Sequence, residues 1–374
     1  MKRYHTIDHL RATMILIVMF GHALLPYITI PRAFNDPQEH VGFDVIAIFL
    51  YSFAMPVFFV TAGFSTALIY YRKGGRGLAR SRFYRIFLPL LAAYALLAPL
   101  TQGAYAFARS VSRSGSIQTG IDQLLLWEWV AWNRAYHLWF LIALLVYSVF
   151  AVGLRSVVRR LGVTEHIVSA SRALFASRWR SVLLTFLVAL GMVPAYVIYG
   201  YDANTWPMQL ALFTFFAGGW LLYLHRDLLP VFGERPWRPI AVALVVLPLA
   251  AWSTRTRLLM PDEAHVLVGA LAGFTNAALA AFMTFGLLGI YQTWLDRASA
   301  TAGYVSDASY WIFLIHFPFV IAVGGALSVT SLPAVIKYLV TVAVVVPLVW
   351  STYHFGVRST SLGRMLKGDK RAGQ

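Results

Sequence analysis

Long apolar stretches recur along the whole chain, and they constrain its fold more than any other feature. A helix that crosses a bilayer takes roughly 17 to 25 residues, and about ten stretches reach this length. They lie near residues 12–30, 44–70, 83–108, 137–155, 181–200, 207–225, 238–254, 266–291, 308–327 and 333–354. The sequence lacks the short alternating segments that are typical of a membrane β-barrel. It predicts an all-α integral membrane protein with about ten transmembrane helices in one bundle.

The composition agrees with a membrane protein and excludes several other classes. Only 12% of the residues are charged, whereas a soluble domain has nearly a quarter. A net charge of +16 would suggest a nucleic-acid partner in a soluble protein. Here the positive-inside rule explains the charge better, so we expect a lipid bilayer and no nucleic acid. The absence of cysteine excludes disulfides and thiolate chemistry, and we expect no metal site and no tightly bound cofactor.

The basic residues also predict the orientation in the membrane. An even number of crossings puts both termini on one side, and 24 of the 31 Lys and Arg residues fall on that side. The positive-inside rule makes it the cytoplasmic side, with residues 358–374 as a basic cytoplasmic tail. The first apolar run has no cleavage signature, so we expect a retained first helix. Without an internal repeat or a separate soluble region, residues 1–374 are predicted to form a single membrane domain.

Three polar residues share one face of the first predicted helix. Asp8 precedes Arg11 by three residues, close enough to pair with it. His22 follows Arg11 by eleven residues, almost three helical turns, or roughly 16 Å along the axis. Ionisable groups are costly inside a membrane and usually face a cavity or a partner, so this stripe is a functional candidate. The alternative is an interfacial anchor at Asp8 and Arg11 and a hydrogen-bonded histidine inside the bundle.

Two further histidines lie in other predicted helices. His137 opens the fourth span at its external end and is followed by Trp139, and His316 lies near the middle of the ninth. Together with His22 they could converge on one cavity, although a sequence cannot show this.

An aromatic segment precedes His137 on the predicted external side. Glu128 stands there between Trp127 and Trp129. Indoles can stack on a sugar ring while a carboxylate hydrogen-bonds hydroxyl groups. The alternative is an interfacial aromatic belt, which is common in membrane proteins.

The most basic cytoplasmic stretch contains an arginine pair, Arg82 and Arg85, at the start of the third span. Their spacing of three residues points both side chains the same way, so they could fork onto phosphate oxygens of a cytoplasmic ligand. The alternative is a contact with lipid headgroups.

Five stretches, in register over almost the whole chain, resemble the acyltransferase-3 family of membrane acyltransferases. Within it the chain looks most like the glucans biosynthesis protein C group, whose members succinylate periplasmic glucans. The matching stretches are Asp8-His9-Leu10-Arg11 with His22, Phe53 to Phe64, Arg82-Phe83-Tyr84-Arg85, His137-Leu138-Trp139-Phe140-Leu141 and Tyr310 to Pro318. The resemblance implies that His22 is catalytic, that Arg11 supports the site, and that Arg82 and Arg85 face cytoplasmic acyl-CoA. It also implies location in a bacterial inner membrane.

The residues themselves fit acyl transfer from succinyl-CoA or acetyl-CoA to a carbohydrate hydroxyl. Histidine suits a general base near neutral pH, and the chain has neither cysteine nor a Gly-x-Ser-x-Gly elbow. His22 either deprotonates the acceptor or is acylated first. Acyl transfer passes through a tetrahedral intermediate whose negatively charged oxygen needs hydrogen-bond donors. His137 and His316 are candidate donors, and Arg11 is a candidate only if the cavity bends toward it.

Two other classes of function remain open from the sequence. Kinked helices with midplane histidines also suit a secondary transporter of an anion or a lipid-linked sugar. A structural partner in a glycan-assembly complex is the third possibility.

Overall fold

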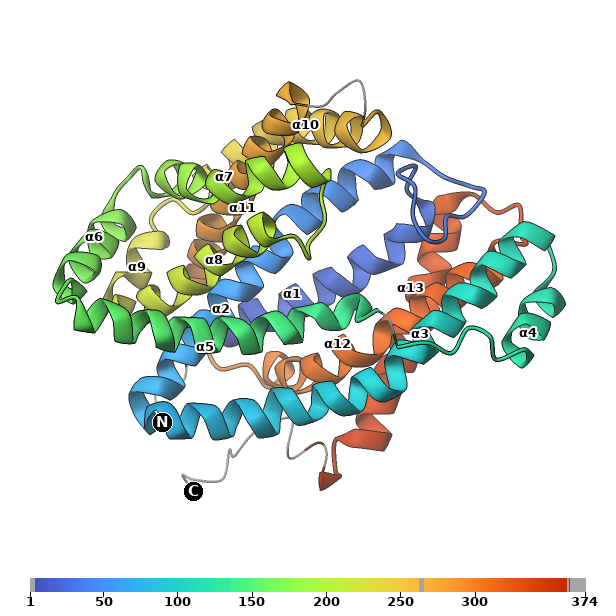
Figure 1. Ribbon diagram of the computed structural model, residues 1–374, viewed down its shortest axis with the longest axis horizontal. Helices are drawn as coiled ribbons and strands as arrows, with labels where there is room; N and C mark the ends of the chain where they lie inside the picture. Colours follow the sequence, from blue (N-terminus) through green and yellow to red (C-terminus); the bar gives the residue numbers. More distant parts are fainter. Residues whose placement is uncertain (1–3, 133, 262–265, 362, 364–374) are drawn as a thin grey trace.

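Every regular element that the structure describes is a helix (Figure 1). The computed structural model describes residues 4–132, 134–261, 266–361 and 363, so most of the predicted basic tail, 358–374, lies outside the described residues. The α-helices are α1 (His5–Leu24), α2 (Val41–Arg82), α3 (Leu88–Ser114), α4 (Ile117–Leu125), α5 (Trp139–Arg160), α6 (Thr164–Ala176), α7 (Arg180–Tyr199), α8 (Trp206–Leu224), α9 (Leu229–Phe232), α10 (Trp237–Leu259), α11 (Leu267–Trp294), α12 (Ala300–Leu327) and α13 (Ala334–Ser351). Short 3₁₀ turns cover Leu25–Tyr27, Tyr136–Leu138 and Arg226–Leu228, and π-helical turns cover Phe83–Phe87 and Thr352–Val357. The prediction of an all-α fold is confirmed.

Nine helical segments within the described residues are long and apolar enough to cross a membrane. The predicted spans 44–70 and 83–108 both fall inside one of them, the 74-residue segment Val41–Ser114. At 1.5 Å per residue this segment would extend about 110 Å if straight, far more than one bilayer. The protein is a multi-pass membrane protein, and the exact number of crossings stays a prediction.

The chain bends inside this long segment. Gly74 has φ 69° and ψ −178°, which interrupts the helical conformation of α2. Such a positive φ suits glycine, because glycine has no Cβ to clash with the backbone. Figure 1 shows that α2 and α3 meet at the lower left, where the chain turns back. The predicted cytoplasmic stretch with Arg82 lies at this turn.

Helix α1 lies in the interior of the bundle against α2 and α12 (Figure 1). Arg11 contacts Ser306, and eleven residues later His22 contacts His316. Because both numbers increase together, α1 and α12 run in the same direction. If α2 and α3 cross the membrane separately, α12 is the ninth crossing and must run in the same direction as α1, the first. The parallel arrangement therefore agrees with two separate crossings.

Two glycines bring α2 and α8 into backbone contact. A Cβ at Gly63 would lie 1.9 Å from the carbonyl oxygen of Phe216, and one at Gly219 would lie 2.0 Å from that of Val60. Small residues allow this close approach of membrane helices. The two glycines therefore set the close packing of α2 against α8.

The loop between α1 and α2 is held by two buried carboxylates. Asp36 pairs with Lys337 of α13 at 2.7 Å, and both side chains are fully buried. Asp44 accepts bonds from the backbone N–H of Thr29 and from Nε of Arg255. Buried charges are stable only when they are paired in this way. The two pairs therefore fix the loop over one end of the bundle.

Candidate active site

A pair of histidines joins α1 to α12. Nδ1 of His22 lies 2.8 Å from Nε2 of His316, and the two rings stack with centroids 5.0 Å apart. His22 occupies the last turn of α1, which ends just before Pro26 because proline cannot donate a backbone hydrogen bond. The structure therefore brings these two predicted histidines together.

The hydrogen-bond partners assign the protons of this pair. Nδ1 of His316 lies 2.9 Å from the carbonyl oxygens of Ile312 and Phe313, which only accept, so this nitrogen carries the proton. In the neutral ring Nε2 of His316 is then an acceptor, and Nδ1 of His22 must donate to it. His22 is left with an unprotonated Nε2, the form that a general base or nucleophile requires.

His137 belongs to the same cluster. Its ring centroid lies 5.5 Å from that of His316, and its Nε2 donates to the carbonyl oxygen of Leu314 at 2.8 Å. The other ring nitrogen, Nδ1, is buried and has no hydrogen-bond partner in the structure. His137 therefore offers one unused acceptor.

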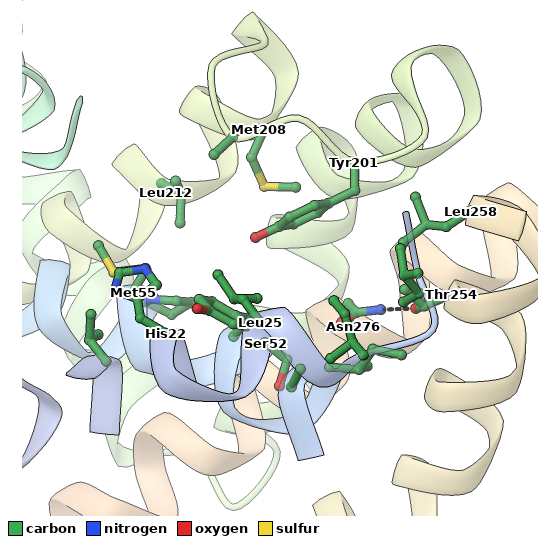
Figure 2. Close-up of a pocket in the computed structure, with 18 of the residues that line it drawn as sticks. His22, Leu25, Ser52, Met55, Tyr201, Met208, Leu212, Thr254, Leu258 and Asn276 are labelled. Atoms are coloured by element: carbon green, nitrogen blue, oxygen red, sulfur yellow. Dashed lines mark hydrogen bonds between the residues drawn. The ribbon is translucent and has the colours of Figure 1, made fainter. Parts of the chain in front are cut away.

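His22 and His137 line a cavity of about 240 Å³ whose walls are mostly apolar. Figure 2 shows how residues from several helices surround it, with the hydroxyl of Tyr201 pointing into the space. Burial raises the pKa of the Tyr201 phenol, so this group stays a hydroxyl at neutral pH. The labelled residues are His22, Leu25, Ser52, Met55, Tyr201, Met208, Leu212, Thr254, Leu258 and Asn276.

The charged residues that line the cavity are of one sign. Arg32, from the loop after α1, is the one Arg or Lys among the described residues that line it, and no Asp or Glu is among them. Arg32 is exposed to solvent, so it stands at an open part of the wall. The cavity therefore offers a positive charge and no carboxylate to a ligand.

Tyr51 of α2 is a cavity residue that the sequence did not single out. Its ring centroid lies 5.9 Å from that of His22, and its hydroxyl oxygen is buried without a hydrogen-bond partner among the described residues. In the sequence Tyr51 is one aromatic residue among many in an apolar span, so no local signal distinguishes it.

The Asp8 and Arg11 pair lies at the opposite end of α1 from His22. Nη2 of Arg11 lies 3.5 Å from Oδ1 of Asp8 and donates to Oγ of Ser306 at 2.9 Å. Both side chains are partly exposed. The predicted pairing is present, but the pair is not brought together with the histidines.

Arg82 points inward at the turn between α2 and α3. Its Nε donates to Oγ of Ser148 at 3.1 Å, and its Nη2 donates to the hydroxyl of Thr66. Arg85 is near enough for the two charges to interact. The hydrogen-bond partners of Arg82 in the described structure, Ser148 and Thr66, are neutral hydroxyls, so its charge is available to an anion.

The remaining predicted residues separate into two groups. Trp139 lines the cavity beside His137. Glu128 is exposed and is not among the residues that line the cavity. Its neighbour Trp129 packs against Gly103 of α3, whose Cβ would meet the indole at 2.9 Å.

Comparisons with known proteins identify the family of this chain. The family model described as "Acyltransferase domain", of the acyltransferase-3 type, matches residues 4–354. Glucans biosynthesis protein C of Salmonella paratyphi B, of Salmonella heidelberg and of Salmonella dublin are each 22% identical over 347 residues. The match covers 87% of this chain and 84% of each relative. No solved structure matches the chain.

The family match spans nearly all of the chain and decides between the classes of function that the sequence left open. The histidine pair, the cavity and the arginines all lie within the matched residues. The chain belongs to the acyltransferase-3 family and is a membrane acyltransferase.

Proposed function

We propose that this acyltransferase moves a succinyl or acetyl group from cytoplasmic acyl-CoA to a hydroxyl of an extracytoplasmic carbohydrate. A periplasmic glucan is the proposed acceptor, because the curated relatives are named for glucan biosynthesis. The proposed location is a bacterial inner membrane. The observation that carries the proposal is the His22–His316 pair, of which His22 lines the cavity.

The histidine pair supports a specific role for His22. With its Nδ1 proton held by His316, His22 presents Nε2 as the base that removes the proton of the acceptor hydroxyl. His316 then stabilises the imidazolium and holds the ring in place, as a carboxylate does in a catalytic triad. The same tautomer also serves a route in which Nε2 attacks the thioester and becomes acylated.

The arginines at the α2–α3 turn support the donor side of the proposal. Arg82 keeps donors and charge available for phosphate oxygens, and arginine binds phosphate in a bidentate manner. Its partner Thr66 lies ten residues along α2 from Pro56, which lines the cavity. Ten helical residues span about 15 Å. The extended pantetheine arm of acyl-CoA suits this separation, with the CoA phosphates at Arg82 and the thioester in the cavity.

Arg32 supports an anionic acyl group. A succinyl group ends in a carboxylate, and the cavity offers it an arginine with no competing acidic residue among the described lining residues. An acetyl group makes no use of this charge. We therefore propose succinyl-CoA as the preferred donor.

The test uses the purified protein in proteoliposomes with radiolabelled succinyl-CoA or acetyl-CoA on one side and glucan on the other. We expect labelled glucan when donor and acceptor are on opposite sides, with a higher kcat/KM for succinyl-CoA. Absence of labelled glucan with either donor, while the acyl-CoA stays intact, would contradict the proposal.

Arg32→Gln refines the choice of donor. We expect it to lower kcat/KM for succinyl-CoA by about tenfold, the loss of one charge-assisted hydrogen bond, and to leave acetyl-CoA unchanged. Arg134→Gln is the matched control, since Arg134 is also exposed but does not line the cavity. An equal effect of Arg32→Gln on both donors would remove the argument for succinyl.

A further inference from the structure

We propose that the hydroxyl of Tyr51 binds the carbonyl oxygen of the acyl group during transfer and is a further catalytic residue of this site. This inference rests on the proposed function, since it concerns the same cavity and the same reaction. Nothing in the sequence or in the comparisons assigns a role to Tyr51.

The first argument is the state of the hydroxyl. The oxygen of Tyr51 is inaccessible to solvent and makes no hydrogen bond in the structure, although the residue lines the cavity. Leaving a buried donor unpaired costs free energy, and such groups in native proteins call for an explanation. A ligand with an acceptor oxygen in the cavity would satisfy this donor.

The second argument is position. Tyr51 and Met55 are one helical turn apart on α2, and both line the cavity, so the cavity-facing side of α2 carries Tyr51. The Tyr51 ring lies against Gly21, 3.7 Å from where a Cβ would be, and 5.9 Å from the centroid of His22. A thioester carbonyl group that reacts beside Nε2 of His22 therefore lies next to the Tyr51 ring.

The third argument is the lack of other donors against His22. Its ring contacts in the described structure are with Tyr51, His316 and Phe317. His316 already uses its one proton on backbone carbonyls. His137, which also lines the cavity, has likewise spent its N–H on Leu314 and keeps only a lone pair. Tyr51 is the ring neighbour of His22 with a donor to spare.

The step that Tyr51 assists is the formation of the tetrahedral intermediate. His22 Nε2 takes the proton of the acceptor hydroxyl as its oxygen bonds to the thioester carbon. The π electrons of the carbonyl move onto its oxygen, which accepts the hydrogen bond from Tyr51. Collapse breaks the carbon–sulfur bond, and the sulfur of coenzyme A receives the proton from His22. If His22 itself attacks first, the same oxygen becomes negative, so the role of Tyr51 does not depend on the route.

Tyr51→Phe tests the inference, because it removes the hydroxyl and keeps the ring. Removing one donor to an oxyanion lowers kcat by about 10² to 10³, and we expect this loss with KM for donor and acceptor unchanged. Tyr310→Phe is the matched control: its hydroxyl is also buried without a partner, but Tyr310 does not line the cavity. Its kcat is expected to equal that of the wild type.

The outcomes separate this inference from the function on which it rests. Wild-type transfer together with an unchanged kcat in Tyr51→Phe would overturn the role of Tyr51 and leave the proposed function standing. Failure of the wild type to acylate glucan from any donor would overturn both. If Tyr51→Phe does not fold, 3-fluorotyrosine at position 51 keeps the ring and strengthens the donor. We then expect a higher kcat, and an unchanged kcat would overturn the inference.

Discussion

Two groups of buried polar side chains in this protein differ in whether they are paired. Asp36, in the loop after α1, and Asp44, in the first turn of α2, are fully buried, and each is bound by a cation and by a backbone N–H. In the cavity, the hydroxyl of Tyr51 and Nδ1 of His137 are buried and have no hydrogen-bond partner in the part of the chain that the structure describes. Buried polar groups are paired in nearly all native structures. Because Tyr51 and His137 also line the cavity, we infer that the cavity is built for a ligand, whereas the paired carboxylates stabilise the loop.

The two groups are neighbours along the chain. The loop begins directly after the turn that carries His22, and its residue Arg32 lines the cavity. The buried ion pair of Asp36 with Lys337 therefore fixes the segment that bears the cavity's positive charge. Changes that leave paired groups without partners, or that remove unpaired ones, test this division of roles.

The largest effect is expected at His316, which pairs with the base. His316→Ala frees Nδ1 of His22, so the ring loses both its orientation and its tautomer. By analogy with the loss of the orienting group in a catalytic triad, kcat is expected to fall by about 10² to 10⁴ at unchanged KM. Steady-state kinetics in proteoliposomes measure this. His316→Gln, whose amide oxygen can accept from His22, should retain more activity, and equal losses in the two variants would count against a positioning role.

Lys337→Met leaves the carboxylate of Asp36 buried without its cation. Breaking a buried pair in this way costs about 3 to 5 kcal/mol, which thermal unfolding in detergent would show as a lower Tm. Asp36→Asn combined with Lys337→Met removes both charges and should recover most of the loss. A single variant as stable as the wild type would show that the pair does not hold the loop.

Arg82→Gln removes the charge at the turn between α2 and α3. Loss of a charge-assisted hydrogen bond to phosphate should raise KM for acyl-CoA by about tenfold or more and leave kcat unchanged. Arg159→Gln, an exposed arginine on the same predicted side, serves as the control. Equal KM values for Arg82→Gln and the wild type would remove Arg82 from the donor site.

The smallest effect is expected at Glu128. Its side chain is exposed and does not line the cavity, and exposed groups outside a buried site contribute little to binding. Glu128→Gln should therefore change KM for glucan by about twofold at most. A large rise in this KM would instead make the tryptophan segment on the predicted external side part of the acceptor site.

The sequence predicted the helical class and several members of the site, because membrane helices leave a strong periodic and compositional signal. His22, His137 and His316 stand out as ionisable groups in apolar spans, and the structure places them within one cluster. A connection between the predicted spans 44–70 and 83–108 was expected, but the sequence did not show that it would be helical with one interruption at Gly74. Because the helical conformation continues through this connection, nine segments are found instead of ten.

The sequence could not predict which polar groups would be left without partners. Tyr51 looks like any other aromatic residue of a span, and its unpaired hydroxyl depends on contacts between α1 and α2. The pairing of Asp36 with Lys337 joins residues 301 positions apart. Arg11 and His22 appear equivalent as members of one stripe, and the pairing of Arg11 with Asp8 was predicted. Only the structure shows that Arg11 also donates to Ser306, while His22 lines the cavity.

The most direct measurement of the central claim compares the wild type with His22→Ala under identical conditions. Both proteins would be reconstituted at equal amounts, with labelled succinyl-CoA on one side and glucan on the other, and the initial rate of glucan labelling would be measured. Loss of a general base should lower the rate by about 10² to 10⁴, with unchanged Tm and unchanged binding of acyl-CoA. Equal rates in the two proteins would contradict a catalytic role for His22 and for the cavity that it lines.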